Sequence, residues 1–188
     1  MKLFFIYALL CATYGDAQTC PCDNSQLCSP ITSRATREIF AFHLADSKDW
    51  PSYDWTTITT VAIFGGTTVE PALYCHAHSR GVRVVLVATY FNWTQLTSAV
   101  YRTTWATAWA ADVAAARVDG LNLDLEGASY IEAPRKDLVT AVAAEVASLI
   151  RAANTFTQIS FDLSIRPRDY STGYDFAALS TICEFLIP

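Results

Sequence analysis

The chain has 188 residues, of which 52% are hydrophobic and 16% are charged, and its formal net charge is −5. This length and apolar fraction are enough for one sizeable core, and the acidic balance provides no basic surface for nucleic acid. We therefore expect no nucleic-acid partner.

The first residues have the features of a secretory leader. Met1-Lys2 precedes an apolar run at 3–11, and small residues follow up to Ala17. This order predicts a signal peptide over residues 1–17, cleaved before Gln18. The later apolar stretch at 137–153 carries charged residues at helical spacing, so we interpret it as a core-facing helix and expect no membrane partner after cleavage.

Five cysteines remain after the leader, namely Cys20, Cys22, Cys28, Cys75 and Cys183. The C-P-C-x5-C spacing resembles part of a metal site, but no nearby histidine completes it, so in an oxidising compartment we expect disulfides and no metal. Because five is odd, either one thiol stays buried and free, or its partner lies in sequence beyond this chain. Asn92-Trp93-Thr94 is an N-glycosylation acceptor sequence, so Asn92 is a predicted glycosylation site.

Strand and helix signals alternate along the chain. Strands are predicted at 38–44, 59–64, 82–89, 119–126, 158–165 and 182–187. A helix is expected to begin at Glu70-Pro71 and to end before Gly81, and the Ala-rich run 96–117 favours a second one. A third is predicted after Pro134, with an apolar stripe made of Leu138, Val142, Val146, Leu149 and Ile150. The alternation indicates βαβ units and an α/β fold with a parallel sheet.

The stretch 118–127, V-D-G-L-N-L-D-L-E-G, carries the chemistry. Strand alternation places its leucines on one face and Asn122, Asp124 and Glu126 on the other. Carboxylates in such a pattern often sit on a solvated sheet face or bind calcium. Here helical segments flank the strand, which favours a polar row that looks into a barrel, with Glu126 at the carboxyl end where barrel active sites lie.

These residues resemble the D-x-x-D-x-D-x-E signature of family-18 glycoside hydrolases. Asp119, Asn122, Asp124 and Glu126 occupy its four places, with Asn in the second place instead of Asp. The segments 37–42, 52–65 and 78–86 are similar to the first strands of the di-N-acetylchitobiases, a lysosomal branch of that family. The resemblance implies a (β/α)8 TIM barrel, here truncated after about six strands, so that residues 18–188 form the N-terminal part of one barrel domain.

The resemblance also implies a retaining hydrolase of N-acetylglucosamine linkages, chitobiose-type, whose substrate supplies its own acetamido oxygen as nucleophile. Glu126 is the expected proton donor, and we expect partial burial and its neighbour Asp124 to raise its pKa. Asp124 is expected to hold the acetamido N–H, and Asn122 to hydrogen-bond Asp124 from beneath. Asp119 has the opposite strand parity, so we expect it to satisfy backbone donors near the strand start. No cofactor is expected.

Several further residues give weaker signals. Tyr90 and Trp93 follow the third strand, where aromatic rings could stack on sugars, and Asp162 could face the barrel, join the polar network and contact the substrate. We expect His43, His76 and His78 to be structural histidines, and Trp50, Tyr53 and Trp55 to pack between the first strand and the next helix.

Two alternatives to the enzyme stay open: a non-catalytic carbohydrate-binding relative and an inactive partial chain. The expected partner is an oligosaccharide that contains N-acetylglucosamine, and the expected location is the lysosome or, failing that, the exterior of the cell. Because a sheet of six strands does not close, we also expect the polar row to face water.

Overall fold

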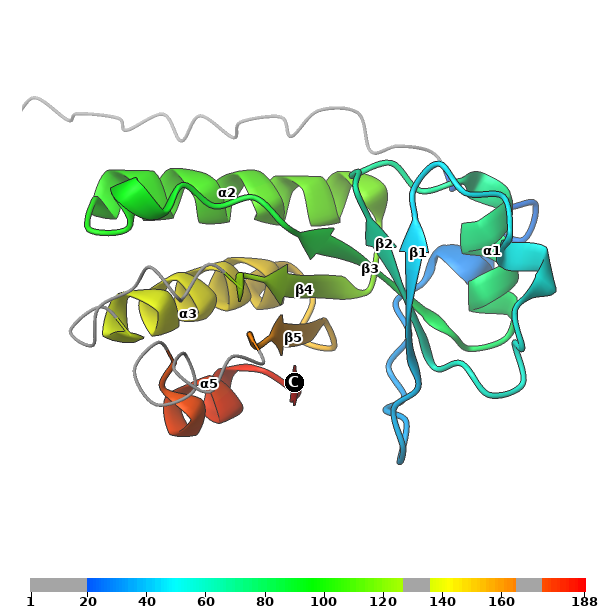
Figure 1. The fold of residues 1–188 in the computed structure, drawn as a ribbon. Coiled ribbons are helices and arrows are strands. Elements are labelled where there is room, and N and C mark those ends of the chain that lie inside the picture. Colours follow the sequence, from blue (N-terminus) through cyan, green and yellow to red (C-terminus); the bar gives the residue numbers. More distant parts are fainter. Residues whose placement is uncertain (1–19, 127–135, 165–173) are drawn as a thin grey trace, which may run out of the picture.

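The chain folds into a curved parallel sheet with helices packed against its outer face (Figure 1). The computed structural model describes residues 20–126, 136–164 and 174–188. The described strands are β1 (Phe40–Leu44), β2 (Thr60–Phe64), β3 (Arg83–Ala88), β4 (Gly120–Asp124), β5 (Gln158–Asp162) and β6 (Phe185–Ile187). The described α-helices are α1 (Pro71–Ser79), α2 (Ala99–Ala116), α3 (Lys136–Ala153) and α5 (Phe176–Ile182), and short 3-10 helices are η1 (Ser25–Cys28), η2 (Trp50–Ser52) and η3 (Trp93–Gln95). The predicted signal peptide and the predicted helix start at Pro134 lie outside the described residues.

The strands follow one another in the sheet in chain order, each parallel to its neighbours. This confirms the parallel sheet that the alternating signals predicted. The prediction was wrong at Ile182, which ends helix α5 and does not begin a strand. The side chain of Asp175 caps α5 by accepting a hydrogen bond from the N–H of Ala178 at 3.0 Å. A short apolar run fits a strand or a buried helix equally well, and this cap decides for the helix.

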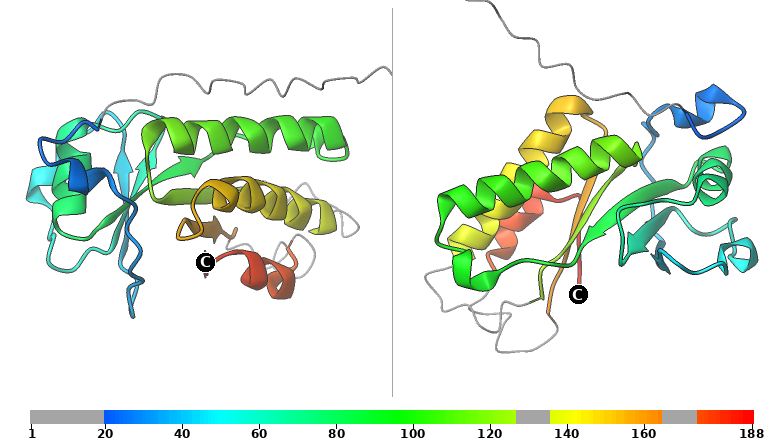
Figure 2. Two further views of the ribbon diagram at one scale, coloured as in Figure 1. Left: turned by 180° about the vertical axis from the view of Figure 1, so that it is seen from behind. Right: turned by 90° about the horizontal axis from the view of Figure 1, so that it is seen from above.

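The sheet curls until the inner faces of its first and last described strands meet. Phe40 of β1 and Phe185 of β6 pack edge to face, with ring centroids 5.6 Å apart. At the same amino-terminal end of the strands, Gln158 Nε2 donates a hydrogen bond to Glu38 Oε1 at 3.4 Å. Helices α2, α3 and α5 lie along the outer face in all views (Figure 2). A curled parallel sheet with helices outside is the wall of a (β/α)8 barrel, here seen through six strands.

Alternating side chains divide the core between the two faces of the sheet. On the outer face, Leu121, Leu123 and Leu125 are buried in the main core together with residues of the helices, as the sequence predicted. On the inner face a smaller apolar cluster contains Ala62, Val85 and Val87, and Phe40 and Phe64 pack against it. The inner face of β1 to β3 is therefore largely apolar, with the buried polar residues Thr60 and Arg83 at the first positions of β2 and β3, and the polar row lies on β4 and β5.

Local signals fix the helix ends. Pro71 occupies the first turn of α1, and Gly81, two residues beyond its end, has a φ of +71°, a conformation that glycine adopts without a steric penalty. Ser98 caps α2, since its Oγ accepts a hydrogen bond from the N–H of Tyr101 at 3.2 Å. Both starts agree with the predicted helices.

Helix α3 buries most of its predicted apolar stripe. Val142, Val146 and Ile150 are buried and Leu138 is partly buried, but Leu149 is 40% exposed. Neighbouring residues on a helix point about 100° apart, so the face that buries Ile150 leaves Leu149 at its margin. No helix of the described segments is long and apolar enough to cross a membrane.

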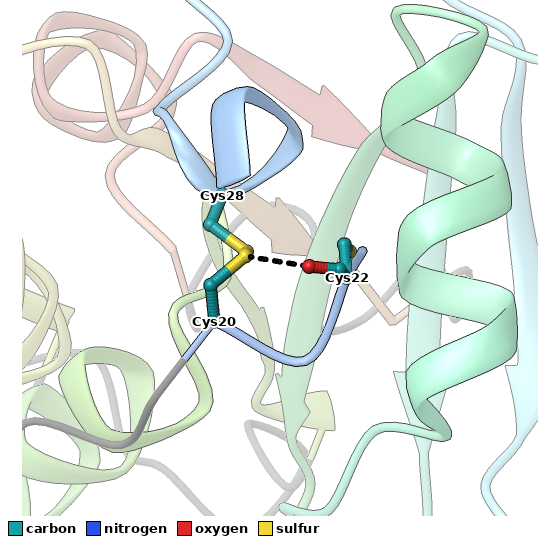
Figure 3. Close-up of side chains that lie close together, drawn as sticks. All are labelled: Cys20, Cys22 and Cys28. Atoms are coloured by element: carbon teal, nitrogen blue, oxygen red, sulfur yellow. Dashed lines mark hydrogen bonds between the residues drawn. A yellow bond between two sulfur atoms is a disulfide. The ribbon is translucent and has the colours of Figure 1, made fainter. Parts of the chain in front are cut away.

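Disulfides tie the N-terminal segment together, as expected. Cys20 pairs with Cys28, and Cys22 pairs with Cys75 of α1, which fastens this segment to the helix. Three of these sulfur atoms lie within 4.8 Å of one another, but their disulfide bonds leave no thiolate to ligate a metal. The Cys20 sulfur also lies 3.7 Å from the carbonyl oxygen of Cys22 (Figure 3). Cys183 is the buried free thiol, and burial raises its pKa to about 12.

Candidate active site

Three polar side chains follow the inner face of β4, and their exposure increases toward its carboxyl end. Asn122 is fully buried, Asp124 is half-buried and Glu126 is exposed. The expectation that the whole row would face water is therefore wrong, because the curl of the sheet covers its deeper part. The expected partial burial of Glu126 is also wrong, since this residue lies two positions beyond the last residue of β4, at the open edge.

Asp162 of β5 joins this row from the neighbouring strand, as predicted. It is the register partner of Asp124, and it is only 7% exposed. The Nδ2 of Asn122 donates hydrogen bonds to Asp162 Oδ1 at 2.8 Å and to Ser160 Oγ at 3.0 Å. The predicted bond from Asn122 to Asp124 is not the one that forms, because residues two apart on a strand are about 7 Å apart, whereas adjacent strands are about 4.8 Å apart.

Burial and mutual repulsion perturb the carboxyl groups of this cluster. Burial raises the pKa of Asp162 to about 7; the Asn122 hydrogen bond opposes this rise, and the charges of Asp124 and Glu126 contribute to it. Burial, with a further contribution from Glu126, also raises the pKa of Asp124. Among the described residues, Asp124 receives no side-chain hydrogen bond, and Asn122 Oδ1 is buried without a partner. The cluster is thus able to hold protons near neutral pH and has polar atoms that remain unpaired.

Asp119 has a structural role, as its parity indicated. Its Oδ2 accepts hydrogen bonds from the N–H of Val84 at 2.9 Å and from His78 Nε2 at 2.9 Å. Its Oδ1 accepts one from the N–H of Ile31 at 3.2 Å. A buried carboxylate needs such donors, and these three join the N-terminal segment, α1 and β3 at the start of β4.

The aromatic residues after β3 differ in accessibility. Tyr90 is 73% exposed, whereas Trp93 is half-buried and packs against Phe91 with ring centroids 5.1 Å apart. Asn92 caps η3, and its Oδ1 accepts hydrogen bonds from the N–H and the hydroxyl of Thr94 at 3.2 and 2.8 Å. Sugar stacking by Tyr90 or Trp93, and glycosylation at Asn92, stay predictions.

The histidines have aromatic and carboxylate neighbours. His43 is buried on the outer face of β1, where its Nδ1 lies 2.8 Å from the hydroxyl of Tyr53, and burial lowers its pKa. His76 packs against Trp50 and Trp55, with ring centroids 5.5 and 4.9 Å away. These contacts confirm that the aromatic residues pack between β1 and α1.

Sequence reasoning missed two features near the polar row. Ser160 lies on the same face of β5 as Asp162. Its place two residues before Asp162 in a predicted strand could have indicated this. A cavity of 730 Å³ opens at the carboxyl ends of β1 and β2, where Leu44, Phe64 and the ion-paired Lys48 and Glu70 contribute to its lining. The carboxyl ends of parallel strands share one edge of a sheet, so this cavity and Asp124 open on the same side.

Comparisons with known proteins agree with this arrangement. No protein-family model matches the sequence. The chain is 34% identical to di-N-acetylchitobiase of Mus musculus over 172 residues, which cover 90% of this chain and 46% of that protein. It is 35% identical to di-N-acetylchitobiase of Bos taurus over 131 residues, which cover 70% of this chain and 73% of that protein. The chain thus spans about half the length of several curated relatives that it matches.

Two solved structures with the same fold are chitinases. A chitinase from Trichuris suis superposes with a TM-score of 0.64 at 14% identity, over 78% of this chain and 49% of that one. A catalytic domain of the Group II chitinase of Ostrinia furnacalis, solved in complex with (NAG)5, gives a TM-score of 0.63 at 12% identity, over 79% and 49% of the two chains. At such identities the likeness shows the fold, while the family follows from the closer sequence relatives. The chain belongs to the di-N-acetylchitobiase family.

Proposed function

We propose that this protein is a glycoside hydrolase that cleaves N-acetylglucosamine linkages in chitobiose-type oligosaccharides or chitin oligomers. The observation that carries the proposal is the pair Asp124 and Glu126, one half-buried and one exposed, on the inner face at the carboxyl edge of a curled parallel sheet. Active sites of (β/α)8 enzymes are built at this edge. Glycoside hydrolysis needs a carboxylic acid that reaches the departing oxygen and a second group that stabilises positive charge.

Glu126 is the proposed acid and base. Its side chain is exposed at the open edge, where an oligosaccharide has access to it. It donates a proton to the glycosidic oxygen as the bond breaks, and the resulting carboxylate then takes a proton from the water that completes hydrolysis. The proton removed from water restores the acid, so the enzyme returns to its starting state.

Asp124 is the proposed partner of the substrate's acetamido group. It is half-buried and accepts no side-chain hydrogen bond from another described residue, so its carboxylate is available to a ligand N–H. Holding the acetamido group turns its carbonyl oxygen toward the anomeric carbon, which it attacks as the leaving group departs. The cyclic intermediate carries positive charge that the Asp124 carboxylate stabilises, and opening by water gives retention of configuration.

Related proteins support the proposed substrate class, and sequence features with the disulfides support the proposed location. The relatives are named di-N-acetylchitobiase, and one structural neighbour was solved in complex with (NAG)5. We propose an oligosaccharide containing N-acetylglucosamine as the partner. The predicted signal peptide and the disulfides support passage through the secretory pathway, with the lysosome as the proposed destination and secretion as the alternative.

Incubation with chitotriose, followed by chromatography of the products, tests the proposal. The protein should release N-acetylglucosamine and the disaccharide, and NMR at early times should show the newly formed end with the anomeric configuration of the substrate. Glu126→Gln should lower the rate by about three or more orders of magnitude while binding, measured by calorimetry, persists. Glu145→Gln on α3 is the matched control, since Glu145 contacts Thr103 of α2 on the outer helices, and it should retain the rate.

The other outcomes identify the alternatives. Binding of chitotriose without turnover by the unaltered protein would make it a carbohydrate-binding relative. A folded protein that neither binds nor cleaves would be an inactive partial chain. Full turnover by the Glu126→Gln variant would refute the assignment of the acid.

A further inference from the structure

Asp162 is a buried carboxyl group for which the proposed reaction has no direct use. It lies on β5, deeper than Glu126, and only 7% of it is exposed. Its register partner across the sheet is Asp124, and both side chains point to the inner face. Adjacent strands are about 4.8 Å apart, so rotation about the side-chain bonds brings the two carboxyl groups within reach of each other.

Hydrogen bonding fixes Asp162 and leaves Asp124 free. The amide of Asn122 is fully buried, and its Nδ2 donates to Asp162 Oδ1 at 2.8 Å and to Ser160 Oγ at 3.0 Å. No side chain of the described segments holds Asp124 in the same way. The hydrogen bond from Asn122 therefore fixes the carboxyl group of Asp162 beside the more accessible carboxyl group of Asp124.

The charges that act on Asp162 within the described residues come from β4 and from the segment directly after it. The titratable groups that face it within the described residues are Asp124 and Glu126, and β6 presents Ile187, its apolar register partner. Within residues 20–126, 136–164 and 174–188, neither a lysine nor an arginine contributes to its electrostatics, so in this part of the chain a second negative charge beside Asp124 lacks a compensating cation. Burial and the two neighbouring carboxylates raise the pKa of Asp162 to about 7, so this deeper group keeps a proton to a higher pH.

We propose that Asp162 is a positioning residue: the carboxyl groups of Asp124 and Asp162 hold one proton between them, and the proton resides on Asp162 so that Asp124 stays ionised. This proposal rests on the function proposed above for Asp124. The neutral Asp162 carboxyl group donates its O–H toward the Asp124 carboxylate and continues to accept from Asn122. As the pH rises, the proton leaves Asp162 for solvent and two carboxylates then face each other.

Carbon-13 NMR of the aspartate carboxyl groups tests the position of the proton without any need for turnover. Asp162 in the unaltered protein should titrate near pH 7, after Asp124 has ionised. In the Asp124→Asn variant its pKa should fall toward the ordinary aspartate value, because one of the neighbouring charges is gone. Titration of Asp162 in the ordinary range, or a pKa near 7 that Asp124→Asn leaves unchanged, would overturn the proposal.

The pH dependence of hydrolysis tests the positioning role. Asp162→Asn keeps an acceptor for Asn122 and an N–H donor for Asp124, so it should retain the rate within about tenfold and keep the acid limb of the profile, where Asp124 ionises. Asp162→Ala removes the donor, so its acid limb should move to higher pH. A purely structural role would lower the rate of Asp162→Ala at every pH without moving that limb, and this result would refute positioning.

These two measurements separate the inference from the proposed function. If the protein does not cleave chitotriose, the NMR titration still shows whether Asp162 holds the shared proton. If the protein cleaves chitotriose and Asp162 titrates in the ordinary range, the proposed function stands and the inference fails. Asp46→Asn, which changes an exposed carboxylate in the loop after β1, is the control and should leave both the profile and the Asp162 titration unchanged.

Discussion

The buried carboxyl group of Asp162 should make the stability of this protein depend on pH, and Asp162→Asn should remove that dependence. The folded-state pKa is about 7, whereas the ordinary pKa of an aspartate is 3.8. Because the folded pKa is the higher one, the folded state holds this proton to a higher pH than the unfolded state does. The stabilisation is therefore fully present below pH 3.8, is lost as the pH rises to about 7, and does not change further above that.

The size of the effect follows from the two pKa values. At about 1.4 kcal/mol for each pH unit between 3.8 and 7, the ionised protein loses about 4 kcal/mol of unfolding free energy at this one site. Relaxation of the sheet or entry of water would reduce this, so about 2–4 kcal/mol is the expected range. A domain of this kind has about 5–15 kcal/mol in total, so the effect is large enough to measure.

Urea denaturation followed by tryptophan fluorescence, at pH 4, 6 and 8, measures the effect. Asp162→Asn should be close to the unaltered protein at pH 4 and more stable than it at pH 8, by the range given above. Asp23→Asn, at an exposed position of the N-terminal segment, is the matched control and should follow the unaltered protein at each pH. A free-energy difference between Asp162→Asn and the unaltered protein that is equal at pH 4 and pH 8 would refute the buried, protonated state of Asp162.

Three other substitutions probe the site and its support. Asp124→Asn should lower the rate of chitotriose hydrolysis strongly and shift its pH profile, because it removes a carboxyl group whose pKa burial raises. An unchanged profile with weaker binding alone would limit Asp124 to binding. Asp119→Ala should lower the unfolding free energy by about 2–5 kcal/mol, since two buried donors and one partly buried donor lose their acceptor, and a melting temperature equal to that of the unaltered protein would contradict this. Gly120→Ala should destabilise the sheet by about 3 kcal/mol or more, because its Cβ would lie 2.1 Å from the carbonyl oxygen of Gln158 on β5; circular dichroism during heating measures the loss, and a native-like transition would count against this register.

Much of the fold could be predicted because the relevant signals are local. Strand alternation in 121–126 placed the leucines outside and the polar row inside, and the structure confirms both. Pro71 and Gly81 marked the ends of α1 through the backbone geometry that each allows. The error at Ile182 has a local cause as well, because a short apolar run specifies neither strand nor helix until a cap or a partner decides.

The candidate site also combines features that local sequence patterns determine with features that they do not. The sequence by itself determined which residues carry carboxylates and amides, and the period of two along a strand determined that Asn122, Asp124 and Glu126 share a face. Only the tertiary structure decided that Asn122 bonds Asp162 instead of Asp124, that Glu126 is exposed, and that the curl buries the deeper part of the row. The physical reason is that hydrogen-bond partners and burial depend on the register and curvature between strands that are 38 to 40 residues apart in the chain, and no local pattern specifies these quantities.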